Sequence, residues 1–201
     1  TPPPALIGRE ALINSFGIAL RRTLAGRPGK SIMAIGLRGV GKTVLLNRFA
    51  EIAEMEGAAV GFIEAPEEGG FLIPLVGRLR GILLRLDRSP VERSVRRALG
   101  VLKSFTYALP DGSAVTLDVD AIAGSGDSGD LASDLTDVLV AVGQAAAERG
   151  TGVVLAIDEV QYLTRAEFGA LITAIHRTIQ LNLPVILVGA GLPQLPGLAA
   201  Q

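Results

Sequence analysis

The sequence predicts an α/β fold, a three-layer sandwich in which a mostly parallel central sheet lies between helices. Short apolar runs alternate along the chain with segments whose apolar residues recur at helical spacing. The runs are apolar throughout, which is typical of strands buried on both faces of a parallel sheet. A glycine-rich segment follows the first run and two acids end a later one, so polar groups gather at one edge of the sheet.

The first part of the chain is predicted to contain three helices and two strands. The expected order is a helix at 12–24, a strand at 31–36, a helix at 42–57, a strand at 58–65 and a helix at 71–87. The last helix is amphipathic and carries Arg78, Arg80 and Arg85, which argue against a membrane span.

Residues 88–129 are less regular, and we expect them to form an insertion into the core. The stretch 89–102 has the pattern of a short helix with a proline near its start. The stretch 104–120 alternates on both sides of "PDGS", which predicts a hairpin. The segment "GSGDSGD" at 124–130 has the composition of a flexible loop.

Regular alternation returns in the last third of the chain. The expected order is a helix at 130–150, an apolar strand at 152–159, a helix at 164–182 and a second apolar strand at 184–191. Asp130 is expected to cap the first of these helices and Gly150 to end it.

The composition limits the classes of function. The 201 residues carry a formal net charge of −1, so the chain as a whole has no bias towards nucleic acid or an anionic membrane surface. Cysteine is absent, which excludes disulfides and thiolate chemistry. No signal peptide is evident, and the chain opens "TPPPALIGRE" without methionine. We therefore expect a cytoplasmic location and a start inside a longer protein.

The segment "GLRGVGKT" has the spacing of a phosphate-binding loop. It comprises Gly36, Leu37, Arg38, Gly39, Val40, Gly41, Lys42 and Thr43. Glycines let successive N–H groups converge on phosphate oxygens, and the N-terminus of the following helix favours the same anion. Lys42 is expected to neutralise the β- and γ-phosphates, and Thr43 to offer its hydroxyl to Mg²⁺. The alternative is a glycine-rich turn without a ligand.

Two acids end the strand "VVLAIDE". Asp158 is expected to emerge at the carboxyl edge of the sheet, where it would hold Mg²⁺ opposite Thr43. Glu159 is placed to activate a water molecule that attacks the γ-phosphate. The pair favours water as the nucleophile over a small-molecule kinase reaction, and its alternative is two solvated acids in a turn.

With both motifs, the chain resembles the AAA+ ATPases, which are P-loop NTPases, and within them bacterial ATP-binding proteins related to origin-recognition ATPases. Residues 36–43 match the Walker A motif of that family and 153–159 match its Walker B motif. The segment "LIGRE" is similar to the opening box of the group, which implies that Ile7 and Gly8 lie against the adenine.

The sequence departs from the family pattern at the end of the strand at 184–191. A polar residue that senses the γ-phosphate is expected near its end, but Gly189, Ala190 and Gly191 stand there, and Gln194 is the nearest candidate. Family members continue into a fifth strand, an arginine finger and a helical lid, which residues 1–201 do not reach. We therefore expect the isolated chain to hydrolyse ATP very slowly.

The resemblance implies ATP/ADP and Mg²⁺ as cofactors, and a protein partner or a homo-oligomer in the full-length protein. It implies no membrane, and DNA only through regions outside this chain. What hydrolysis drives stays open. One alternative is a DNA-associated loader or transposition-accessory ATPase, and another is a nucleotide-gated signalling scaffold with little turnover.

Overall fold

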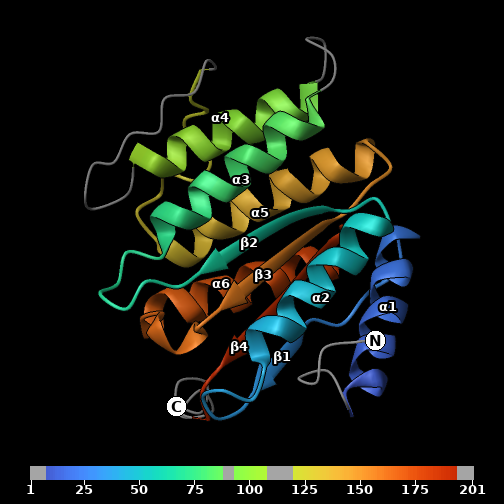
Figure 1. Cartoon of the computed structure of the whole chain (residues 1–201). Coiled ribbons are helices and arrows are strands. Elements are labelled where there is room, and N and C mark those ends of the chain that lie inside the picture. Colours follow the sequence, from blue (N-terminus) through green and yellow to red (C-terminus); the bar gives the residue numbers. More distant parts are fainter. Residues whose placement is uncertain (1–7, 88–92, 108–119, 194–201) are drawn as a thin grey trace.

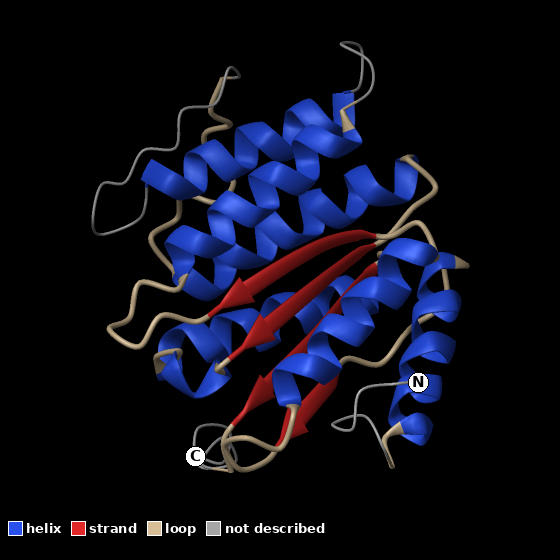
Figure 2. Ribbon diagram, viewed as in Figure 1, coloured by secondary structure: helices blue, strands red, loops and turns tan. Residues whose placement is uncertain are grey.

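The computed structural model describes residues 8–87, 93–107 and 120–193 and confirms the α/β fold (Figures 1 and 2). Its elements, in chain order, are α1 (Glu10–Leu24), β1 (Ile32–Ile35), α2 (Lys42–Met55), β2 (Ala59–Glu64), α3 (Leu72–Leu86), α4 (Arg93–Tyr107), α5 (Leu131–Glu148), β3 (Val153–Asp158), the 3₁₀ helix η2 (Val160–Tyr162), α6 (Arg165–Gln180) and β4 (Val185–Gly191). None of the described helices is long and apolar enough to cross a membrane.

The four described strands form one parallel sheet in the order β1-β4-β3-β2. In β3, Val154 and Ala156 face a core that is shared with α1 and α2, where the rings of Phe16 and Phe49 lie 4.5 Å apart. The alternate residues of β3 face the larger core, which is built from α3, α4, α5 and α6. Because both faces are covered, the strands are apolar without alternation, as the sequence predicts.

The parallel register brings the carboxyl ends of all four strands to one edge. Ile35 of β1 lies opposite Gly191 of β4, and Glu64 of β2 lies opposite Asp158 of β3. In Figure 1 the arrowheads point towards the same side of the molecule, where the loops after β1, β2 and β3 lie. Both sequence motifs therefore reach the same edge.

The predicted hairpin is wrong at its first residues. Residues 104–107 continue α4 instead of forming a strand, because Val101, Leu102 and Phe105 are buried at helical spacing. The hydroxyl of Ser104 donates to the carbonyl of Ile122, which satisfies it within the core. The rest of the predicted hairpin, apart from Asp120, falls on residues 108–119, which lie outside the described residues. The boundaries of the insertion at 88–129 stay a prediction.

The loop at 124–130, predicted as flexible from its composition, is held by carboxylates of α5. Asp134 is 2% exposed and accepts hydrogen bonds from the N–H and hydroxyl of Ser128 and from the N–H of Gly129. Asp137 accepts from the N–H of Gly126 at 3.1 Å. Asp130 caps the helix as predicted, by accepting from the N–H of Ser133.

These contacts predict that Asp134 is a stabilising residue. Asp134→Ala should lower the free energy of unfolding by about 2–3 kcal/mol, because three donors of the loop lose a buried carboxylate as their acceptor. Asp127→Ala is the matched control, since its exposed carboxylate accepts one bond, from Gly124, and should cost about 0.5 kcal/mol or less. Urea unfolding of the two variants measures the difference, and equal losses would show that the loop does not depend on α5.

Candidate functional site

The glycine loop connects β1 to α2 at the carboxyl edge of the sheet. Gly39 and Gly41 have φ values of 78° and 79°, in the left-handed region that side chains disfavour. Gly36 has a different constraint, because a Cβ there would lie 3.1 Å from Cγ2 of Val40. The loop therefore needs its glycines in order to turn as tightly as it does.

The N-terminus of α2 is left without a side-chain cap. Its N-cap is Gly41, and no acid lies in its first turn. By contrast, Asp130 caps α5, and Thr164 and Glu167 form a capping box on α6. The free N–H groups and the positive end of the helix dipole are suited to an anion such as phosphate.

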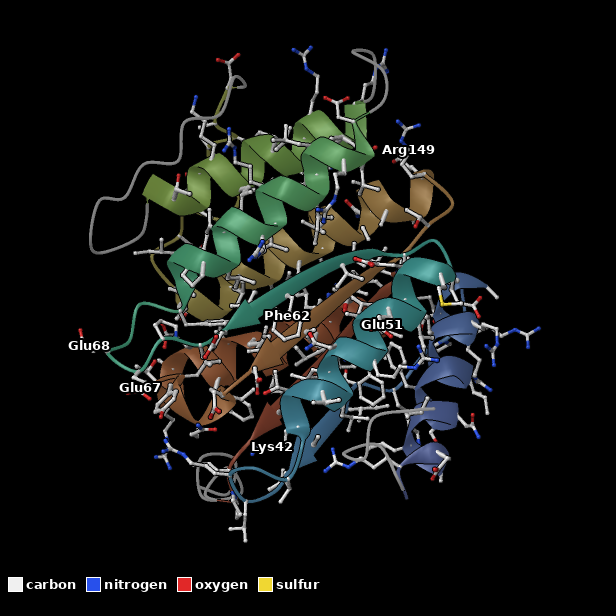
Figure 3. The ribbon with its side chains drawn as sticks, viewed as in Figure 1. Lys42, Glu51, Phe62, Glu67, Glu68 and Arg149 are labelled. Carbon is white, nitrogen blue, oxygen red and sulfur yellow. The ribbon has the colours of Figure 1, made fainter. Side chains whose placement is uncertain are left out.

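Lys42 lies inside the glycine loop and is 7% exposed (Figure 3). Its Nζ donates to the carbonyl oxygens of Gly36 and Leu37, at 3.1 and 2.9 Å. The two carbonyls accept from two of the three donors of the ammonium. Lys42, which is predicted to bind phosphate, is thus held at the loop, and its positive charge lies beside the uncapped N-terminus of α2.

Thr43 and Asp158 meet across 115 residues of sequence. The hydroxyl of Thr43 donates to Oδ2 of Asp158 at 2.5 Å, and Oδ1 of Asp158 accepts from the N–H of Glu159 at 2.9 Å. Hydroxyl and carboxylate oxygens are ligands that Mg²⁺ prefers. Among the described residues, no group of three or more histidine, cysteine or acidic side chains is arranged to hold a metal ion. The pair fits Mg²⁺ bound in the usual way, through one or two protein oxygens and the phosphates of a nucleotide.

Glu159 has a strained backbone directly after β3. Its φ and ψ are 54° and 40°, in the left-handed region that glutamate rarely adopts. Its Oε2 accepts a hydrogen bond from Nε2 of Gln161. The strained turn sends the chain into η2 and leaves the carboxylate half-buried beside Asp158, where a water-activating group was predicted.

Arg9 is a residue of the site that the sequence reasoning missed. Its guanidinium donates to the carbonyl of Gly41 at 3.0 Å and to that of Val40. Of the two residues predicted to meet the adenine, Gly8 is exposed with a φ of 79°, and Ile7 lies outside the described residues. Arg9 therefore links the segment before α1 to the glycine loop. Its position within "LIGRE" was the sequence feature that could have indicated this role.

A chain of three polar side chains joins the glycine loop to the loop after β2. The guanidinium of Arg38 donates to the hydroxyl of Tyr162 at 3.0 Å, and that hydroxyl donates to Oε1 of Glu67 at 2.8 Å. These residues line a cavity of about 500 Å³ together with Glu64, Ala65, Pro66 and Glu159. Arg38 is thus engaged with Tyr162, and the cavity opens beside the proposed base.

The end of β4 has no room for the polar side chain that was expected there. A Cβ on Gly189 would lie 2.4 Å from Sδ of Met33 and 3.2 Å from Cγ2 of Val160. Ala190 is fully buried. Gln194, the nearest polar candidate along the chain, lies outside the described residues. The side chain of Met33 therefore occupies the space that a side chain on Gly189 would need.

This combination of a glycine loop, an uncapped helix and a threonine–aspartate pair defines a P-loop nucleotide-binding site on a parallel sheet. The chain matches the AAA ATPase domain over residues 5–188, and it belongs to that family. It is therefore an ATP-binding AAA+ core, as the resemblance implies.

The fold is similar to that of Cdc6p from Pyrobaculum aerophilum, in a crystal structure. The TM-score is 0.54 and the sequence identity is 19%, over 97% of this chain and 41% of that one. At this identity the likeness concerns the fold alone. No curated protein sequence gave a significant match.

The contacts of Tyr162 predict a shifted titration. Donation to the Glu67 carboxylate raises the pKa of Tyr162 above its ordinary value of 10.0, with a smaller effect of desolvation, while Arg38 acts in the opposite direction. Ultraviolet titration in a Tyr107→Phe background, which leaves one tyrosine, should therefore give a value above 10.0. Glu67→Gln should lower it and Arg38→Ala should raise it. A pKa that neither change moves would contradict the contact chain.

Proposed function

We propose that the chain binds Mg·ATP at the glycine loop and hydrolyses it to ADP and phosphate. The observation that carries the proposal is the 2.5 Å contact between Thr43 and Asp158, which joins the two motifs at one edge of the sheet. A glycine-rich turn without a ligand would have no need for this contact, nor for a buried lysine within the loop. The proposal accounts for both.

In this reaction the residues of the chain have separate tasks. Lys42 would exchange its two loop carbonyls for oxygens of the β- and γ-phosphates, while the N–H groups of the loop and of α2 bind the remaining oxygens. Thr43 and Asp158 would hold Mg²⁺, which when bound neutralises charge on the phosphates. Glu159 would accept a proton from the attacking water, and the cavity beside it gives that water access.

We further propose that nucleotide state is passed to a protein partner or to a second copy of the chain, as the family resemblance implies. Both alternatives stay open. Salt-dependent DNA binding by the full-length protein would favour a loader or transposition-accessory role. Nucleotide-dependent partner binding without turnover would favour a signalling scaffold.

The division of labour between the two acids predicts different defects. In the full-length protein, Glu159→Gln should keep ATP affinity and slow phosphate release about 10²- to 10⁴-fold, because an amide of the same size does not accept the proton. Asp158→Asn should instead reduce the gain in ATP affinity that Mg²⁺ provides.

The matched control is Glu68→Gln, which makes the same charge change in the exposed loop after β2 (Figure 3). It should leave both affinity and rate unchanged. Affinity is measured by calorimetry with and without Mg²⁺, and turnover by phosphate release at saturating ATP. Hydrolysis by Glu159→Gln at the wild-type rate would place the base elsewhere.

A further inference from the structure

The side-chain amide of Gln161 bridges two parts of the site that are distant in sequence. Its Nε2 donates to Oε2 of Glu159, and its Oε1 accepts from the N–H of Leu192 at 3.0 Å. A carboxylate only accepts and a backbone N–H only donates, so a single orientation of the amide satisfies both. Gln161 therefore links the proposed base to the first residue after β4.

The same peptide unit after β4 also contacts the glycine loop. The carbonyl of Gly191 accepts from the N–H of Gly36 at 3.1 Å, and the N–H of Leu192 is bound to Gln161. The carbonyl and the N–H belong to one planar peptide bond, which moves as a rigid unit. The Gly191–Leu192 peptide therefore joins Gly36 of the loop to the amide of Gln161.

Gln161 takes a position that β4 itself leaves without a polar side chain. Gly189 has no space for one, since Met33 and Val160 lie against it, and Ala190 is buried. Val160, which is 1% exposed, seats η2 on β4 and so fixes the start of the turn that carries Gln161. The polar group at this end of the sheet comes from η2.

The acidic surroundings of Glu159 explain why its carboxylate needs a hydrogen-bond donor such as Gln161. The cavity beside Glu159 is also lined by Glu64 and Glu67, and Asp158 precedes it in the chain. These carboxylates repel Glu159, and the nearby cation Arg38 is bound to Tyr162. A neutral amide that donates to Oε2 holds the carboxylate without neutralising it.

We propose that Gln161 is a positioning residue that aligns Glu159 for the attack of water and couples it to the glycine loop through the Gly191–Leu192 peptide. This inference rests on the proposed function, because the alignment matters only if Glu159 acts on a bound nucleotide. It places on η2 a polar side chain at the end of the sheet where the family pattern has one on β4.

Two variants separate the two hydrogen bonds of the amide. Gln161→Met keeps the length of the side chain and removes both bonds, whereas Gln161→Glu can still accept from Leu192 but does not donate to Glu159. Single-turnover hydrolysis should slow about 10- to 100-fold in both, as expected for a misplaced reacting group, with the Kd for Mg·ATP within about threefold of wild type. Because the methionine variant adds no charge, repulsion does not explain its defect.

Amide hydrogen exchange of Leu192, followed by NMR without turnover, gives a readout that is independent of activity. Exchange should be faster in Gln161→Met than in wild type and near the wild-type rate in Gln161→Glu. Gln180→Met, the same substitution on the exposed end of α6, is the matched control and should change neither exchange nor hydrolysis.

The outcomes distinguish this inference from the proposed function. If wild type hydrolyses ATP and Glu159→Gln does not, but Gln161→Met or Gln161→Glu is as fast as wild type, the positioning role is overturned while the ATPase stands. If the full-length wild-type protein releases no phosphate, the proposed hydrolysis fails and so does the alignment that depends on it. Unchanged Leu192 exchange in Gln161→Met overturns the bridge in either case.

Discussion

The contact between Thr43 and Asp158 is the constraint on which the rest of the site depends. β4 lies between β1 and β3, so the two strands that carry the motifs are about 10 Å apart, twice the spacing of neighbouring strands. The contact spans this gap because Thr43 stands on the first turn of α2 and Asp158 ends a strand of the same parallel register. β4 itself ends in Gly189, Ala190 and Gly191, and so places no polar side chain between the two motifs.

Two cations near this contact, Lys42 and Arg9, donate hydrogen bonds to backbone carbonyls of the glycine loop. The Lys42 ammonium rests on two carbonyls of its own loop, and Arg9 binds two more at the start of α2. The loop is therefore ordered by internal hydrogen bonds before any phosphate binds. In the proposed function, binding would exchange the carbonyl partners of Lys42 for phosphate oxygens of opposite charge, which attract the ammonium more strongly. This gain would come without the cost of ordering a mobile loop, which is the usual benefit of preorganisation.

The sequence predicts the parts of this structure that are encoded locally and misses those that depend on distant contacts. The strands, most helices, the glycine loop and the acid pair each follow from a short pattern of spacing and residue type. Gln161 and the chain from Arg38 through Tyr162 to Glu67 bind residues 31 or more positions away, so no local pattern indicates these contacts. Arg9 also binds a distant segment, and its place in "LIGRE" was the only local signal for it. The loop at 124–130 has the composition of a flexible segment, but two carboxylates of the next helix hold it. At 104–107 alternation suggested a strand, and burial at helical spacing decided for a helix.

The most direct test of the account is the affinity of Mg·ATP for Lys42→Ala, measured by calorimetry beside wild type and Lys30→Ala. Lys30 is an exposed lysine before β1 and controls for the loss of one positive charge. Thermal unfolding of the three proteins checks that the fold survives removal of the buried side chain. Lys42→Ala should lower affinity by about 10- to 100-fold or more, since at least one charge-assisted hydrogen bond to phosphate is lost, while Lys30→Ala should bind as wild type does. Equal affinities for all three folded proteins would contradict the assignment of the glycine loop as the phosphate site.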